Sequence, residues 1–137
     1  MNEEIKFRGK DIEFGTWAYG YLTISKLHGF HKIHFQDNDY LWHETDVLPE
    51  TVGQFTGLRD KNGKEIYRGD IVRLYFDDGK EFIFEITFDK KQMCWLANHK
   101  EPIHTTSLYN LKILSGSAHS NIEVIGNIHD NADLLNN

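Results

Sequence analysis

The sequence predicts an all-β protein, and two observations support this expectation. Segments rich in aromatic and β-branched residues recur at roughly the eight- to twelve-residue spacing that is typical of short strands. No long segment shows the periodicity of a helix, and the 137-residue chain contains only two prolines. A chain of this length can bury a core without the help of a metal or a disulfide.

The clearest strand is Glu81–Phe88, which reads EFIFEITF. Phe82, Phe84 and Ile86 share one face of this segment, as the two-residue period of a strand requires. The turn Asp77–Lys80 contains Asp-Gly and joins this strand to another over Ile71–Phe76. Because the primed turn types need positive φ, Asp-Gly between two such segments predicts a hairpin.

The segment Pro49–Leu74 is the densest in turn residues, and we take it to organise the chain. Asp60–Gly63 predicts a tight turn, and Gly69-Asp70 predicts a second turn in which Asp70 accepts a hydrogen bond from backbone. The pattern resembles the corner of a small β-barrel. We therefore expect two subdomains, residues 1–57 and residues 58–137.

The remaining segments are assigned more coarsely. Expected strands cover 5–8, 17–24, 30–35, 40–42, 93–97 and 122–128, and Gly9–Asp11 is expected to end the first of them. Residues 36–39 should form a hairpin turn, 43–46 a polar connection, and 106–114 either a short helix or a strand. Residues 131–135 should form a turn or a short helix.

Composition limits the classes of function. The formal net charge is −6, with 15 basic and 21 acidic side chains, which counts against broad binding to phosphate backbones. Cys94 is the one cysteine, so an internal disulfide is excluded and a reducing compartment is favoured. No apolar run approaches the ~20 residues that span a bilayer, and the N-terminus lacks the apolar segment of a signal peptide. We expect a cytoplasmic protein with no membrane partner.

Three blocks of the sequence together resemble the YopX family of phage and prophage proteins. They are FRGKDIEFGTWAYGYL (7–22), ETVGQFTGLRDKNGKEIYRGDIVRL (50–74) and EVIGNIHDNADLL (123–135). The resemblance implies a β-rich fold whose C-terminal half is an SH3-like β-barrel, an origin in a phage or prophage, location in a bacterial host cell, and self-assembly. It implies no activity. Ala132 stands where family members often have proline.

Clustered polar residues suggest no catalytic constellation. His28, His31 and His34 are spaced as H-x-x-H-x-x-H, but a strand would direct His31 away from the other two, so we favour solvent-facing histidines over a metal site. His43 lies close in sequence to the carboxylates of Glu44 and Asp46, for which a solvated turn is the simpler interpretation. Cys94 is expected to be a small buried hydrophobe. We therefore expect no enzyme activity, no metal and no cofactor.

The excess of aromatic residues points to binding, because aromatic side chains that do not fill the core form a protein–protein patch or a base-stacking platform. The leading hypothesis is a non-enzymatic assembly or interaction module that works as a homo-oligomer through residues 1–57, with a phage or host protein as a further candidate partner. The alternative is nucleic-acid binding through a cluster among Lys61, Lys64, Arg68, Arg73 and Lys80. The candidates for binding residues are Trp17, Tyr40, Trp42, Phe55, Arg68 and Arg73.

Overall fold

The computed structural model describes residues 4–115 and 120–136. The chain divides into two compact units, Met1–Gly57 and Leu58–Asn137. Antiparallel strands account for most of both units and helix is scarce, so the expected all-β class is confirmed. Among the described residues no helix combines the length and the apolar character needed to cross a membrane.

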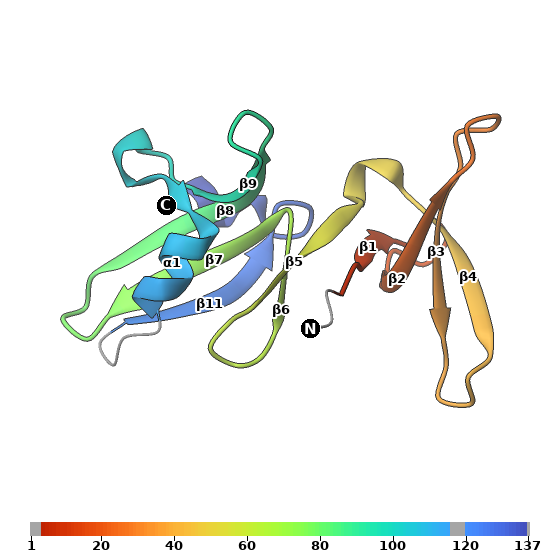
Figure 1. Cartoon of the computed structure of the whole chain (residues 1–137), viewed down its shortest axis with the longest axis horizontal. Helices are drawn as coiled ribbons and strands as arrows, with labels where there is room; N and C mark the ends of the chain where they lie inside the picture. Colours follow the sequence, from red (N-terminus) through yellow and green to blue (C-terminus); the bar gives the residue numbers. More distant parts are fainter. Residues whose placement is uncertain (1–3, 116–119, 137) are drawn as a thin grey trace. The chain divides into compact units, whose positions relative to one another are not determined.

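The N-terminal unit is an antiparallel sheet in the order β4-β3-β2-β1-β5 (Figure 1). The strand bounds are β1 Phe7–Lys10, β2 Trp17–Ile24, β3 His31–Gln36, β4 Trp42–Val47 and β5 Gly53–Arg59, with a 3-10 turn at Pro49–Thr51 before β5. One face of the sheet is internal, because Ile33 and Val47 lie on it and are almost fully buried.

Two boundaries in this unit differ from those expected. Gly9 does not end the first strand: β1 continues through Lys10, and a Cβ on Gly9 would lie 2.8 Å from Val47 Cγ2, so glycine there permits close packing. Tyr40 is not in a strand, because its φ of 64° places it in the β3–β4 turn. Strand β4 instead begins at Trp42 and includes 43–46, which we expected to be a polar connection.

The C-terminal unit contains a five-stranded antiparallel sheet in the order β10-β9-β8-β7-β11. Its elements are β7 Asp70–Phe76, β8 Glu81–Asp89, β9 Cys94–Asn98, β10 Thr106–Ser107, α1 Leu108–Ser115 and β11 Ser120–Asn127, with 3-10 turns at Pro102–His104 and Ala132–Asn136. The end of β5 and strand β6 (Glu65–Tyr67) also belong to this unit. In the described residues β10 and β11 remain the two edges of the five-stranded sheet, so closure into a barrel is not seen and the SH3-like character stays a prediction.

Helix α1 lies over this sheet (Figure 1), and the described residues of the sheet, α1 and β6 share one cluster of buried apolar side chains. Phe84 and Ile86 of β8 are buried in it, as the alternating pattern predicts, and Leu108 and Leu111 reach it from the helix. Residues 106–114 therefore contain both of the expected alternatives, a two-residue strand followed by a helix. The β7–β8 hairpin is also confirmed, with Gly79 at φ 91° and the Gly79 N–H donating to the Phe76 carbonyl at 3.0 Å.

Two buried carboxylates hold the turns of the central segment. Asp70 Oδ2 accepts the Tyr67 N–H at 2.7 Å, which confirms the role expected for it. Asp60 Oδ1 accepts the N–H groups of Asn62 and Lys64, and Asp60 Oδ2 accepts the Val124 N–H at 3.0 Å. Asp60 thus joins the β5–β6 turn to β11, a contact between segments far apart in sequence.

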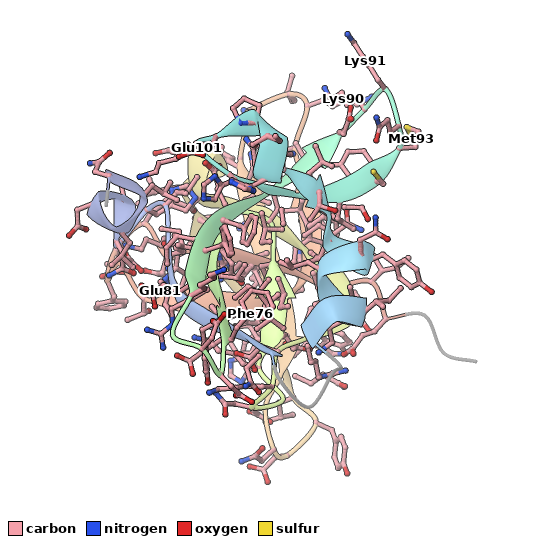
Figure 2. The ribbon with its side chains drawn as sticks, turned by 90° about the vertical axis from the view of Figure 1, so that its left-hand side faces the viewer. Phe76, Glu81, Lys90, Lys91, Met93 and Glu101 are labelled. Atoms are coloured by element: carbon pink, nitrogen blue, oxygen red, sulfur yellow. The ribbon has the colours of Figure 1, made fainter. Side chains whose placement is uncertain are left out.

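The β8–β9 connection corrects one further boundary. Met93 was expected to begin a strand, but its φ is 53° and β9 begins at Cys94. Figure 2 shows Lys91 extending outward beyond Lys90 and Met93 at this turn. Cys94 is half-buried, so the thiol is less enclosed than expected.

Candidate functional site

The two units distribute their apolar side chains differently, and this directs attention to the N-terminal unit. Among the described residues, three apolar side chains are buried in the N-terminal unit against twelve in the C-terminal unit. Large exposed apolar side chains show the reverse distribution, with eleven in the N-terminal unit and four in the C-terminal unit. Where exposed apolar side chains gather into one patch, the patch marks an interaction site.

Strands β2, β3 and β4 direct a set of aromatic side chains to one face, which we call the aromatic face. Its aromatic members are Tyr21 and Trp42. Tyr21 is 60% exposed and Trp42 59% exposed, and their ring centroids lie 6.0 Å apart. They share a face because Tyr21 pairs with His34, which pairs in turn with Glu44, two residues along β4 from Trp42. Tyrosine and tryptophan are the residues most enriched where proteins bind one another.

Charged side chains continue the aromatic face toward the other end of the strands. Lys32 Nζ lies 3.3 Å from Glu44 Oε1 and 3.2 Å from Asp46 Oδ1. The Asp46 and Glu44 carboxylates hold the pKa of Lys32 above its usual value. His34 Nε2 lies 2.7 Å from the Thr23 hydroxyl, and its Nδ1 lies 3.5 Å from Glu44 Oε2. The result is an aromatic patch bordered by a charged row in which one lysine lies between two carboxylates.

Two grooves adjoin Tyr19. A groove of about 440 Å³ is lined by Asp11, Thr16, Trp17, Ala18, Tyr19, Phe35 and Thr45. A smaller one of about 210 Å³ lies among residues 4–6, 19–21 and 34–36. The carboxylate in the larger groove is engaged, since Asp11 accepts the Thr45 hydroxyl and the N–H groups of Glu13 and Phe14. Those bonds lower the pKa of Asp11, with the Thr45 hydroxyl the largest cause. The groove therefore offers apolar walls for contact more than a group for acid–base chemistry.

The structure divides the aromatic residues that the sequence suggested for binding into exposed, half-buried and buried side chains. Trp42 lies on the aromatic face, and Tyr40 is exposed in the turn that leads into β4. Trp17 is half-buried, with the Arg8 guanidinium 4.6 Å from its ring centre, and lines the larger groove. Phe55 is a correction: it is only 3% exposed, so it fills the core of the N-terminal unit and does not present a binding surface.

The basic candidates do not gather into an open cluster. Arg73 Nη2 lies 3.2 Å from Glu123 Oε1, and Lys61 Nζ lies 3.2 Å from Glu123 Oε2. Lys61 also donates to the Tyr75 hydroxyl, which is the largest cause of its raised pKa, followed by Glu123. Arg68 is exposed at the turn between β6 and β7. A shared carboxylate therefore already offsets two of the cations that the nucleic-acid hypothesis requires.

His31 and His34 are oriented as expected, whereas His43 does not face the carboxylates beside it in sequence. His28 lies in the β2–β3 turn, and His31 and His34 lie on opposite faces of β3. His43 points to the face opposite Glu44 and Asp46. Its ring stacks on Phe35 with the ring centroids 5.4 Å apart, and its Nε2 lies 2.7 Å from Asp37 Oδ2. Among residues 4–115 and 120–136, no three His, Cys, Asp or Glu side chains are grouped so as to hold a metal ion.

A second histidine cluster, which sequence reasoning missed, lies in the C-terminal unit. His99 and His104 have ring centroids 5.1 Å apart and line a pocket of about 290 Å³ with Phe82, Glu81 and Glu101. Figure 2 shows Glu81 and Glu101 on this side of the unit. The Glu101 N–H donates to His99 Nδ1 at 2.9 Å, and both imidazoles pack against Phe82. These contacts order the connection after β9, which is a sufficient structural role for the pair.

The comparison with known proteins settles the family. The family model described as YopX protein matches residues 6–136. The chain belongs to the YopX family. The resemblance seen in the three sequence blocks is thus confirmed, and the match includes the intervening segments that carry no motif of their own.

One solved structure extends the comparison of this YopX-family chain. This chain is similar to the crystal structure of protein EF1440 from Enterococcus faecalis, with a TM-score of 0.58 and 20% sequence identity. The match covers 98% of this chain and 99% of the EF1440 chain. At that identity the likeness shows a shared fold. A search of the curated proteins gives no match.

Proposed function

We propose that this YopX-family protein is a non-enzymatic interaction module that assembles as a homo-oligomer through its N-terminal unit. The observation that carries the proposal is the aromatic face of β2, β3 and β4, where Tyr21 and Trp42 are more than half exposed and in contact. A unit with few buried and many exposed apolar side chains gains most from association, because burial removes that surface from water.

The charged row supports a protein partner over a nucleic acid. Lys32 is bracketed by two carboxylates, so the face offers no surplus of positive charge to a phosphate backbone. Nucleic-acid binding is therefore the less favoured alternative. The further parts of the proposal follow from the family resemblance and the composition: an SH3-like C-terminal half, a phage or prophage origin, and a place in the host cytoplasm.

Sedimentation velocity over a wide range of concentrations tests the proposal. The unmodified protein should sediment as an oligomer at micromolar concentration. The double variant Tyr21→Ser, Trp42→Ser should weaken association by about 30-fold or more, since loss of one buried aromatic anchor typically costs about 2 kcal/mol of binding free energy.

The matched control is Tyr109→Ser, which removes a tyrosine that is 68% exposed on α1 of the other unit. It should sediment like the unmodified protein. A monomer at every concentration, or equal weakening by the control and the double variant, would contradict the proposal.

A further inference from the structure

Strand β4 is an edge strand of the N-terminal sheet, and part of its outer side is open. The Leu41 carbonyl, just before β4, accepts the Asp37 N–H at 3.0 Å. The odd-numbered residues of β4 therefore direct their backbone N–H and C=O groups toward β3. The Asp46 carbonyl accepts the Ile12 N–H at 3.0 Å, which shows that even-numbered residues direct theirs outward. Among the described residues, the outward N–H and C=O groups of Trp42 and Glu44 have no hydrogen-bond partner.

This edge lacks several of the features that usually prevent strand addition. Natural edge strands are protected by charged side chains, lysine above all, by proline, by bulges, by very short length or by a covering loop. The charged side chains of β4, Glu44 and Asp46, both lie beside Lys32 of the same copy. Strand β4 reads WHETDV over Trp42–Val47, without lysine or proline, and it pairs with β3 without a break in register. Its open backbone groups are therefore available to another extended strand.

We propose that β4 of a second copy of this chain pairs antiparallel with this edge, about a two-fold axis at His43. The inference rests on the homo-oligomer of the proposed function and specifies its interface. A symmetric pair of this kind is self-complementary, as an isologous dimer requires. Trp42 of one copy is opposite Glu44 of the other, and each such pair exchanges two backbone hydrogen bonds.

The neighbouring registers are less suitable. A pair centred on Glu44 would place two carboxylates directly opposite each other, and it would also engage Asp46, whose carbonyl is already bonded to Ile12. A pair centred on Trp42 would place Tyr40 opposite Glu44, but Tyr40 has a φ of 64° and cannot continue the strand. Only the register centred on His43 uses both open residues of the edge.

This register also extends the aromatic face across the two copies. Trp42 and Glu44 share that face, so pairing places Trp42 of one copy in the row that contains Glu44, His34 and Tyr21 of the other. At each end of the paired strands, exposed Leu41 of one copy approaches exposed Ile12 of the other. Apolar contact thus accompanies the backbone hydrogen bonds.

Disulfide trapping tests the axis. In a Cys94→Ser background, His43→Cys places two thiols at a non-hydrogen-bonded pair, where Cα atoms lie about 4.5 Å apart, within reach of a disulfide. Mild oxidation of the full chain should convert most of this variant to a covalent dimer. Lys26→Cys, exposed in the β2–β3 turn, is the matched control and should yield little dimer.

Proline substitution tests the edge. The Glu44 N–H points outward, so Glu44→Pro spares the bonds between β3 and β4 but removes the N–H needed for pairing. It should weaken association by about 100-fold, while Glu44→Ala, which lacks the same carboxylate, should change it by only a few-fold. If circular dichroism shows that Glu44→Pro unfolds the unit, the disulfide trapping of His43→Cys decides whether the β4 interface forms.

The outcomes separate this inference from the proposed function. If the unmodified protein associates but His43→Cys oxidises no faster than Lys26→Cys, the β4 interface is wrong and the homo-oligomer stands. If the unmodified protein is a monomer, both are wrong. Rapid trapping at His43 together with selective weakening by Glu44→Pro supports the interface.

Discussion

The N-terminal and C-terminal units show two ways in which a small antiparallel sheet can treat its apolar faces. In the C-terminal unit, α1 covers the sheet and buries Leu108 and Leu111 against Phe84. In the N-terminal unit, the internal face buries Ile33 and Val47, while the opposite face leaves Tyr21 and Trp42 exposed. The difference teaches that the C-terminal unit completes its core within itself, whereas the N-terminal unit leaves large apolar side chains exposed, as the proposed association requires.

The largest expected effect comes from a cavity in the C-terminal core. Phe84→Ala removes a ring that is almost fully buried, and we expect it to lower the free energy of unfolding by about 3–5 kcal/mol. Urea denaturation followed by circular dichroism measures this. Tyr109→Ala, on the exposed side of α1, should change the same quantity by less than about 0.5 kcal/mol. A loss for Phe84→Ala below about 1 kcal/mol would contradict the self-contained core.

Removal of the buried carboxylate of Asp60 should have the next largest effect. Asp60→Ala leaves the N–H groups of Asn62, Lys64 and Val124 without their acceptor, and we expect a loss of about 2–3 kcal/mol in the free energy of unfolding. Asp78→Ala is the matched control, because Asp78 accepts one N–H in an exposed turn. Equal losses for the two variants would show that Asp60 does not stabilise the unit beyond its own turn.

A smaller effect concerns how stability depends on protein concentration. In the variant Trp95→Phe, the remaining tryptophans, Trp17 and Trp42, both report on the N-terminal unit. For a dimer, each tenfold rise in concentration should stabilise that unit by about 1.4 kcal/mol per mole of dimer. The variant Trp17→Phe, Trp42→Phe retains only Trp95 and, at concentrations where sedimentation shows that it still associates, should unfold independently of concentration. Fluorescence-detected denaturation at several protein concentrations measures this difference between the two units. The same concentration dependence of stability in both variants would contradict it.

The smallest effect is the dependence on pH of the β3–β4 turn. The hydrogen bond from His43, followed by that from the Leu41 N–H, lowers the pKa of Asp37 from its ordinary value of 3.8. The stability that Asp37 contributes is therefore complete above pH 3.8 and is lost as the pH falls through the lower folded value. The stability difference between the unmodified protein and Asp37→Asn should stay constant from about pH 5 down to about pH 4 and shrink below it. A difference that grows on acidification would contradict this assignment.

Local patterns predicted much of the fold. The alternation in Glu81–Phe88, the Asp-Gly turn before it and the hydrogen bond to Asp70 all agree with the structure, because each depends on residues within a few positions of one another. One strand boundary was predicted wrongly because a contact between distant residues decided it. Gly9 looked like a strand breaker, but it continues β1 because Val47 packs against it.

The candidate site was less predictable. The aromatic residues were identifiable, and Trp42 was among them, but Tyr21 could not be assigned to the same face as Trp42 without the register of β2, β3 and β4. Phe55 carried the same composition signal and proved to be buried. The cations Lys61 and Arg73 looked available until β11 brought Glu123 beside them.

By itself the sequence determined the all-β class, the family, the principal hairpin and the excess of aromatic side chains, since these follow from composition, motifs and contacts between near neighbours. Tertiary structure alone decided which aromatics are exposed together, which cations are neutralised and that β4 is an edge. The physical reason is that strand order and register depend on pairing between distant segments. Moving a strand by one residue, or placing another beside it, changes its exposed face and its free backbone groups.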